Sequence, residues 1–366
     1  MAGAPVYAQS SSSPDDARER PWWERLTFSG DVRGRYEGFF QDGDEARHRE
    51  RFRLRLGLRA DVTEEVRVTL RLASGETADL TSTNQSFSDF LARKPIQIDQ
   101  VNVAYAPEAA RGLTLGYGKY GYPVTRTQLT WDDDINWEGT YQRYDRTIQG
   151  VDLRLAAAQS PLNEVSDDED AYLFVWSAQA GFAPRGHTVK LTVSDYHFLR
   201  EDQIARAVVA RGLRNPVTNR LDRTPTGAVA GYASEFNLLD VVVEAELKTG
   251  RPAYPVTLLA DVVTNTGAVD ASEDLGTWLV AGYGRAAEPK TWSVTYTYAR
   301  IERDAVVSTF NFSDIPHTNA RVHMVGFSYM PVRRVNLDAT GIFSNVLDGD
   351  PEPWLTRLQV DARFTF

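Results

Sequence analysis

The stretch ERFRLRLGLRAD, residues 50–61, restricts the possible folds more than any other part of this sequence. From residue 52 to residue 60, one parity of positions carries only apolar side chains, namely Phe52, Leu54, Leu56, Leu58 and Ala60. The other parity carries four arginines and a glycine: Arg51, Arg53, Arg55, Gly57 and Arg59. Because successive side chains of a β-strand point to opposite faces, a strand here has one apolar and one cationic face. A barrel in a bilayer offers lipid outside and water inside, so the pattern favours a membrane barrel if it repeats.

The same alternation continues in the two neighbouring stretches, residues 26–37 and 66–72. The arginines that they add to the basic face are Arg33, Arg35, Arg67 and Arg71. Three successive strands are therefore expected to share one basic face.

Composition narrows the class of protein further. A chain of 366 residues is long enough for two or three soluble domains or for one large barrel. No run approaches the roughly 18–20 consecutive apolar residues of a transmembrane helix, which excludes helical membrane spans. The absence of cysteine argues against disulfides and thiolate chemistry, and the net charge of -10 disfavours nucleic-acid binding. No cofactor is expected.

Sixteen stretches qualify as strands, which agrees with the even strand number of single-chain bacterial barrels. They are residues 26–37, 50–61, 66–72, 96–107, 112–120, 136–145, 147–158, 170–182, 187–199, 235–248, 254–264, 276–285, 291–302, 320–330, 334–344 and 355–366. The predicted fold is an all-β, antiparallel, up-and-down transmembrane barrel of about 16 strands with a polar lumen and long extracellular loops. Among the sixteen stretches, residues 136–145 show the weakest sequence evidence for a strand.

The lengths of the connections support this topology. From residue 235 onward, short links alternate with the longer stretches 265–275, 303–319 and 345–354, as expected for periplasmic turns and external loops. The longest connection, residues 200–234, contains IARAVVARGLR, which is expected to form a short helix over the mouth of the barrel. Residues 76–95 and 121–135 either fold inward and narrow the pore or form surface loops, and the sequence favours neither.

Both ends of the chain fit an exported membrane protein. Residues 1–25 are interpreted as the remainder of an export signal followed by a flexible linker, with an ordinary disordered terminus as the alternative, and residues 26–366 as the barrel domain. The last strand ends at Phe366, an aromatic residue of the kind through which barrel-assembly machinery recognises its substrates.

Aromatic side chains near the ends of candidate strands suit the girdles at the two membrane interfaces. The side chains expected there are Trp278, Trp292, Tyr296, Tyr298 and Tyr329. Ordinary packing of β-favouring residues explains each of them equally well.

Several short motifs cluster within residues 72–139. They are Ala73, Ser74, Gly75 and Glu76; Thr81, Ser82, Thr83, Asn84 and Gln85; Asp99, Ala104 and Tyr105; Gly118, Lys119 and Pro123; Trp131, Asp132, Asp133 and Asp134; and Glu138 and Gly139. With these motifs the chain resembles the putative porin family of Gram-negative outer membranes. The resemblance implies an outer-membrane barrel porin whose solute is usually unassigned.

Charged residues on the lumen parity are the candidate functional residues. The predicted pore-lining set is Arg33, Arg35, Arg51, Arg53, Arg55, Arg59, Arg67, Arg71, Asp240, Glu244, Glu246, Asp338 and Asp361, with Asp261 on the same acidic side. Arginines on the early strands facing acids on the later ones set up a transverse field and favour anions along one wall. The alternative is that these arginines pair with neighbours such as Asp31, Glu37 and Glu50 and merely solvate the lumen.

Sites for chemistry are weakly indicated. Asp132, Asp133 and Asp134 are weak candidates for a divalent cation, because adjacent carboxylates more often belong to a solvated loop. The five histidines lack metal-ligand spacing and no nucleophile elbow is present, so no catalytic residue is predicted.

Three classes of function remain open: a passive porin for small polar solutes with modest anion preference, a channel or exporter for an acidic polysaccharide that resembles alginate exporters, and a barrel enzyme or adhesin. The porin is favoured. Its expected partners are outer-membrane lipid and lipopolysaccharide, the barrel-assembly machinery through Phe366, small polar or anionic solutes, and further copies in a homotrimer. Nucleic acid is not expected.

Overall fold

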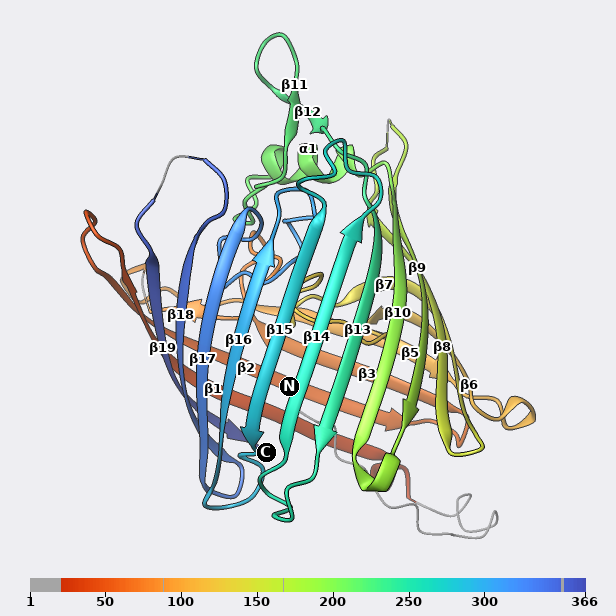
Figure 1. Ribbon diagram of the computed structural model, residues 1–366. Coiled ribbons are helices and arrows are strands. Elements are labelled where there is room, and N and C mark those ends of the chain that lie inside the picture. Colours follow the sequence, from red (N-terminus) through yellow and green to blue (C-terminus); the bar gives the residue numbers. More distant parts are fainter. Residues whose placement is uncertain (1–20, 88, 167, 350–351) are drawn as a thin grey trace.

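A computed structural model describes residues 21–366 except 88, 167 and 350–351, and shows a closed β-barrel (Figure 1). Seventeen strands form one antiparallel sheet, in which β4 (Gln85–Ser86) is a two-residue addition to the side of β2. The other sixteen strands form the barrel: β1 (Leu26–Phe40), β2 (Arg47–Asp61), β3 (Val66–Ser74), β5 (Ile96–Tyr105), β6 (Leu113–Tyr120), β7 (Trp137–Ile148), β8 (Val151–Asn163), β9 (Ala171–Phe182), β10 (Thr188–Leu199), β13 (Asn237–Leu247), β14 (Val256–Asn265), β15 (Leu275–Gly284), β16 (Thr291–Ile301), β17 (Ala320–Val332), β18 (Val335–Val346) and β19 (Leu355–Thr365).

Few residues lie in other elements. The helix α1 (Asp202–Ala210) and the separate hairpin of β11 (Leu221–Arg223) and β12 (Val229–Tyr232) belong to the connection between β10 and β13. Short 3-10 turns are η2 (Trp22–Arg25), η3 (Asp89–Leu91), η4 (Glu108–Ala110) and η5 (Pro184–Gly186). Within the described residues, no helix is both long and apolar enough to cross a bilayer.

Each barrel strand pairs with its neighbour in the chain, and β1 pairs with β19 to close the cylinder. The closing register runs from Asp31 opposite Thr365 to Phe40 opposite Thr356. The predicted barrel of sixteen antiparallel strands is thus confirmed. The weakest predicted strand, residues 136–145, corresponds to β7 and pairs along most of its length with β6 and β8.

The two faces of the strands have opposite character, as the alternation predicts. On β2, Leu56 is 39% exposed on the outside, whereas Arg53 on the other parity is 5% exposed inside the barrel. The same holds on β13, where Leu239 is 45% exposed and Val242 is 1% exposed. The outer surface is therefore apolar, as a lipid-facing wall requires.

Connections of different length gather at opposite ends of the barrel (Figure 1). We name the two ends the short-turn rim and the long-loop rim. The short-turn rim holds residues 62–65, 106–112, 149–150, 183–187, 248–255, 285–290 and 333–334. The long-loop rim holds the described residues of the connections 41–46, 75–95 (without 88), 121–136, 164–170 (without 167), 200–236, 266–274, 302–319 and 347–354 (without 350–351). The helix expected within residues 200–234 is α1, which lies at this rim.

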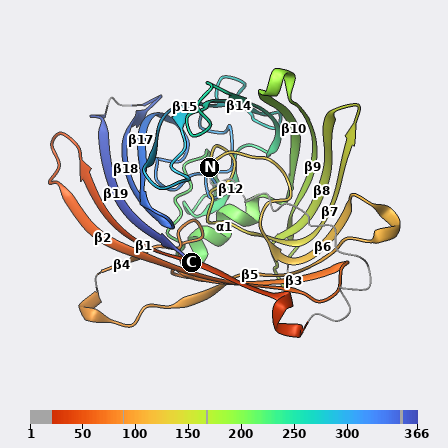
Figure 2. The same ribbon diagram turned by 90° about the horizontal axis from the view of Figure 1, so that it is seen from below.

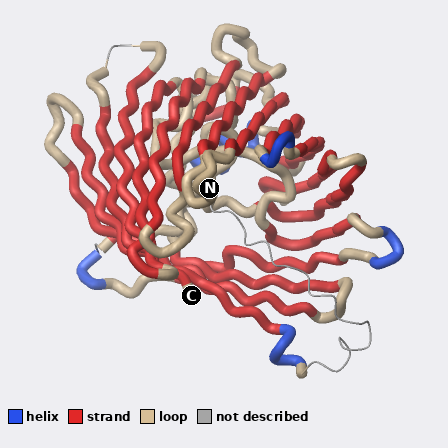
Figure 3. Tube along the Cα trace, turned by 60° about the horizontal axis from the view of Figure 1, so that its bottom comes forward, coloured by secondary structure: helices blue, strands red, loops and turns tan. Residues whose placement is uncertain are grey.

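The hydrophobic core lies inside the barrel and not between two layers. Residues 121–136 and 302–319 fold inward, and Trp131 stacks on Phe310 with ring centroids 5.0 Å apart. Ile204 and Ala205 of α1 join the same cluster of buried side chains. Figures 2 and 3 show these loop segments within the ring of strands. They pack against the wall formed by β8 to β10 and β13 to β16, and Asp314 also reaches β1 and β19.

One predicted girdle residue lies on the wrong side. Trp278 is 4% exposed and packs inside against Phe312, with ring centroids 6.0 Å apart. Its neighbour Leu279, 42% exposed, occupies the outward parity of β15. The prediction for Trp278 was wrong because it considered nearness to a strand end without the parity of that strand. By contrast, Tyr296 is 44% exposed on the outer face.

Candidate functional site: an arginine-lined interior

A continuous group of arginines covers the inner face of β19, β1 and β2. We call it the arginine wall, and its members are Arg33, Arg35, Arg49, Arg51, Arg53, Arg55 and Arg357. Arg33 lies directly opposite Arg53 in the register of β1 and β2, and Arg35 lies opposite Arg51. Like charges opposite each other destabilise a sheet, so this wall requires carboxylates close by.

Two carboxylates come from within the wall itself. Asp31 on β1 accepts hydrogen bonds from Arg53 Nη2 at 2.6 Å and from Arg55 Nε at 2.7 Å. Glu37, also on β1 and fully buried, contacts Arg357 Nη2 at 3.0 Å. A single strand thus supplies acids between rows of basic side chains.

The closing strand provides a third carboxylate. Asp361 on β19 binds Arg35 through two parallel hydrogen bonds of 2.7 Å, from Nε and from Nη2. It also lies 3.8 Å from Arg33 Nη1. This paired geometry fixes the orientation of the Arg35 guanidinium, because a planar fork matches the two carboxylate oxygens.

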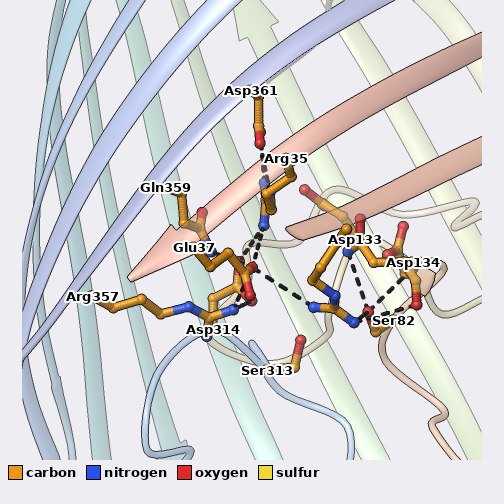
Figure 4. Close-up of polar contacts among 12 residues, drawn as sticks. Arg35, Glu37, Ser82, Asp133, Asp134, Ser313, Asp314, Arg357, Gln359 and Asp361 are labelled. Carbon is orange, nitrogen blue, oxygen red and sulfur yellow. Dashed lines mark hydrogen bonds and ion pairs between the residues drawn. The ribbon is translucent and has the colours of Figure 1, made fainter. Parts of the chain in front are cut away.

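The inward segment 302–319 reaches the wall through Asp314. Its carboxylate contacts Arg35 at 3.3 Å and Arg357 at 2.6 Å, and accepts a hydrogen bond from Gln359 Nε2 at 2.9 Å (Figure 4). Burial by itself raises the pKa of Asp314, but the adjacent Arg357 and Arg35 lower it by more, so the pKa lies well below its ordinary value. The carboxylate is therefore charged and joins the loop to the barrel.

Residues of the segment 75–95 also contact the arginine wall, at Arg33 and Arg51. Asn84 Oδ1 accepts a hydrogen bond of 2.6 Å from Arg33, and Ser82 Oγ accepts one of 3.2 Å from Arg51. Asp134 of residues 121–136 binds the backbone N–H and hydroxyl of Thr83, both at 3.0 Å, and lies 4.0 Å from Arg55. The sequence did not decide whether residues 76–95 and 121–135 fold inward or lie on the surface. Both segments contact side chains inside the barrel.

The three adjacent aspartates do not converge on one point. Asp132 accepts from the backbone N–H groups of Ser313 and Asp134, both at 2.9 Å, whereas Asp133 binds Arg126 at 2.5 Å. Burial and the nearby Asp134 raise the pKa of Asp132. Among the described residues no group of three metal-binding side chains is found.

Other predicted residues lie elsewhere on the inner face. Arg59 and Arg67 both bind Asp61 near the short-turn rim, at 3.5 and 2.7 Å. Arg71 binds Asp99, and its Nη2 donates to Asn136 at 3.2 Å.

Apart from Asp361, the predicted acids of the later strands divide into two groups. Asp240 and Asp261 are buried beneath the inward core, at 1% and 0% exposure, and Thr127 binds Asp261. The others form local pairs near their own strands: Glu244 with Lys190 at 4.0 Å, Glu246 with Arg285, and Asp338 with Arg363 at 3.5 Å. Of the predicted acids on later strands, Asp361 is the one that contacts the arginine wall.

Sequence reasoning missed four residues that complete the wall: Arg357, Gln359, Asp314 and Arg49, the last of which precedes the predicted start of its strand at residue 50. The first two share the parity of Asp361 on β19, so the alternation that selected Asp361 also selects them. Asp314 carries no such signal, because it lies in an irregular segment whose position depends on the packing of Phe310 against Trp131.

The arginine wall carries more positive than negative charge. Seven arginines meet five carboxylates, Asp31, Glu37, Asp134, Asp314 and Asp361, which leaves two positive charges in excess. Serine and asparagine side chains from residues 75–95 extend this surface. The arginines and carboxylates form a largely buried, ion-paired cluster along one side of the interior.

A closed barrel of sixteen strands with a lipid-facing outer surface and a charged interior defines an outer-membrane channel. Residues 39–211 and 205–364 match the family described as putative porin, and the chain belongs to this family. Its location is the bacterial outer membrane.

Solved porin structures share the fold at low sequence identity. OprB of Pseudomonas putida in its high-pH form is 12% identical, with a TM-score of 0.63 over 94% of each chain. The outer membrane channel DcaP of Acinetobacter baumannii is 14% identical, with a TM-score of 0.51 over 93% of this chain and 97% of the other. A trimer form of OmpT from Vibrio cholerae is 9% identical, with a TM-score of 0.52 over 93% of this chain and 99% of the other. No curated protein gives a significant sequence match to this chain.

Proposed function

We propose that this porin is a passive diffusion channel for small polar solutes, with a modest preference for anions. The main supporting observation is the excess of two positive charges in the arginine wall on the inner face of β19, β1 and β2. Fixed charge along one side of a narrow aqueous path concentrates ions of opposite sign there.

The preference is modest because carboxylates neutralise most of the wall. Arg53 and Arg55 share Asp31, and Arg35 binds Asp361 and Asp314. The alternative, in which the arginines only hydrate the interior, leads to a channel without ion selectivity.

The reversal potential of the purified protein in a planar bilayer tests the proposal. Under a salt gradient, the sign of this potential reports whether anions or cations carry more current. An anion-selective potential that weakens as salt rises supports the proposal, because screening shortens the reach of fixed charges. A cation-selective potential removes the anion preference and leaves the channel itself intact.

Two further assays separate this function from the other classes. Liposomes that contain the protein are expected to swell in small sugars, with a rate that falls as the sugar becomes larger, which an enzyme or adhesin does not require. Uronate oligomers that block the current at low concentration favour the acidic-polysaccharide channel instead. A general pore passes small ions with little change when such oligomers are added.

We propose in addition that the protein assembles as a homotrimer. The support is the trimer form of OmpT among proteins of the same fold, together with an exposed apolar segment at η3. Phe90 and Leu91 are fully exposed there, both with positive φ, of 50° and 65°. Mass photometry in detergent tests the assembly, and a polar double variant, Phe90→Ser with Leu91→Ser, is expected to shift trimer toward monomer.

Recognition by barrel-assembly machinery remains a proposal for Phe366, whose side chain is 53% exposed at the end of the chain.

A further inference from the structure

A polar row crosses the outer face of the barrel close to the long-loop rim. Register pairs place Thr277 opposite Arg300, Arg300 opposite Arg321, and Arg321 opposite Asn345, on β15 to β18. All four occupy the outward parity, because the intervening Ala299, Ile301, Ala320 and Val322 are buried inside. Two guanidinium groups therefore stand side by side on a surface that otherwise faces lipid.

The two arginines differ in how they are neutralised. Arg300 binds Glu302, which is itself nearly buried. Arg321 is exposed and lies within ion-pair distance of no carboxylate among the described residues. Directly opposed like charges destabilise a sheet. The pair therefore provides a site for an anion that bridges both groups.

An aromatic layer follows one step toward the middle of the barrel wall. Tyr298 lies opposite His323, and the Tyr296 hydroxyl is 2.7 Å from His323 Nδ1. Trp354, from residues 347–354, approaches the same ring with centroids 5.8 Å apart. Amphipathic rings of this kind occupy the headgroup level of a membrane.

A mainly apolar layer of valine, phenylalanine and tyrosine side chains follows nearer the middle of the barrel wall. Val294 lies opposite Phe327 and Tyr296 opposite Val325, and all four side chains are between 39% and 47% exposed. From rim to middle, the outer face of β16 and β17 thus changes from cationic to aromatic to apolar. This sequence matches, layer by layer, a lipid with a phosphorylated headgroup and acyl chains.

We propose that the outer face of β16 and β17 binds lipopolysaccharide, with a lipid A phosphate between Arg300 and Arg321 and acyl chains along Val325 and Phe327. Long loops of such barrels face the cell exterior, which places this rim in the outer leaflet, where lipopolysaccharide lies. Guanidinium groups bind phosphate oxygens through paired, charge-assisted hydrogen bonds. The lipid neutralises Arg321 and removes the repulsion between the two cations.

The opposite rim offers a matched control. Arg146 on β7 is also an exposed arginine on the outward parity, but it lies next to the short turn 149–150. Its Nη1 lies 3.4 Å from the Tyr144 hydroxyl and no second arginine opposes it, because its register partner is Leu153. Arg146→Gln therefore removes one positive charge from the same surface at the other rim, as each of the two substitutions at Arg300 and Arg321 does at the long-loop rim.

The test measures binding of purified lipid A to the delipidated full chain in detergent, by native mass spectrometry. The double variant Arg300→Gln with Arg321→Gln is expected to weaken binding about tenfold or more, since each hydrogen bond to a charged group contributes about 1.5–3 kcal/mol. Arg146→Gln is expected to bind as the original protein does. Enzymatically dephosphorylated lipid A is expected to bind the original protein about as weakly as intact lipid A binds the double variant.

Folding is checked separately through the difference in gel mobility between unheated and heated samples, which barrels retain when folded. The proposal is overturned if the folded double variant keeps the original affinity, if Arg146→Gln weakens binding as much, or if dephosphorylated lipid A binds equally well. A phosphatidylglycerol that competes as effectively as lipid A overturns the choice of lipopolysaccharide. None of these results depends on the solute or ion selectivity of the pore.

Discussion

Asp314 Oδ1 accepts a hydrogen bond of 2.6 Å from Arg357 Nη2, and this contact joins an inward loop to the strand that closes the barrel. Within residues 302–319, Phe310 stacks on Trp131 in the aromatic core, and Asp314 contacts β19. Because Arg35 on β1 binds the same carboxylate, one side chain joins the two strands that meet at the closure to the loop within. This contact therefore holds residues 302–319 against the two strands that close the barrel.

Replacement of Asp314 by asparagine is expected to weaken the contacts of residues 302–319 with Arg35 and Arg357. The buried arginines keep Glu37 and Asp361, so the loss of stability is expected to be about 1.5–3 kcal/mol, below the cost of leaving a buried charge wholly unpaired. Single-channel current is expected to become larger and noisier. Asp42→Asn, which removes an equal charge from the exposed connection 41–46, serves as control. Equal currents for both variants contradict the expectation.

His317 makes the same loop sensitive to acid. Its Nδ1 lies 2.9 Å from Asn311 Oδ1, and burial lowers its pKa to about 4 from an ordinary value of 6.5. Between pH 6.5 and pH 4 the unfolded chain binds a proton that the folded one does not, so stability falls as the pH falls through this window. The complete difference amounts to about 3 kcal/mol. Above pH 6.5 this contribution is constant.

Hydrogen exchange measures this effect as the protection factors of residues 302–319 at pH 7 and pH 4.5. Protection is expected to fall at the lower pH in the original protein and to stay nearly constant in His317→Asn. Asparagine is neutral throughout and tolerates the positive φ of 67° at this position. His48→Asn, at an exposed histidine, is expected to keep the original pH dependence. Loss of protection in His317→Asn equal to that of the original protein argues against the histidine as the cause.

The barrel could be predicted from the sequence because a single physical rule specifies it. A strand between lipid and water must alternate with period two, and residues 51–60 do so with Gly57 as the one position without a side chain. The position of β7 followed from the requirement that connections alternate between rims, although its own pattern was weak. Regular elements therefore carried enough information for the topology.

The interior could be predicted only in part, because its contacts join residues far apart in the chain. Thr127 meets Asp261 across 134 positions, and Arg35 meets Asp314 across 279 positions. No periodic pattern encodes such pairs, since irregular segments place their side chains through packing. The predicted basic face of β1 and β2 lies inside the barrel, but its acidic partners come mostly from its own strands and the inward loops.

The charge excess of the arginine wall predicts how selectivity changes on mutation. Arg33→Gln with Arg51→Gln removes two positive charges, which equals the excess, and glutamine still hydrogen-bonds to Asn84 and Ser82. The reversal potential of this double variant is expected to move close to zero. Arg67→Gln, near the short-turn rim, where the side chain is 53% exposed, is expected to change it little. An unchanged anion-selective potential in the double variant excludes the wall as its source.

The closure of the barrel depends on a glycine that leaves room for the last side chain. The backbone of Gly30 exchanges two hydrogen bonds with Phe366, of 3.1 and 3.0 Å. A Cβ atom at position 30 meets the Phe366 ring at 2.5 Å and the Arg55 carbonyl oxygen at 2.6 Å. The ring is the free end of a terminal residue and can turn away, whereas the carbonyl is fixed in the β1–β2 ladder.

Valine at position 30 is therefore expected to destabilise the closed barrel by about 1–3 kcal/mol, the usual cost of overpacking. Gly34 provides the matched control, because it lies on the same strand and parity and a Cβ there meets nothing within 4 Å. Gly34→Val is expected to be neutral or slightly stabilising, since β-branched residues suit strands. The temperature at which the unheated gel band converts to the unfolded position ranks the variants. Equal conversion temperatures for Gly30→Val and Gly34→Val contradict this expectation. They show that the backbone at Arg55 shifts enough to accommodate the valine, so that the close approach of Gly30 to Arg55 does not limit closure of the barrel.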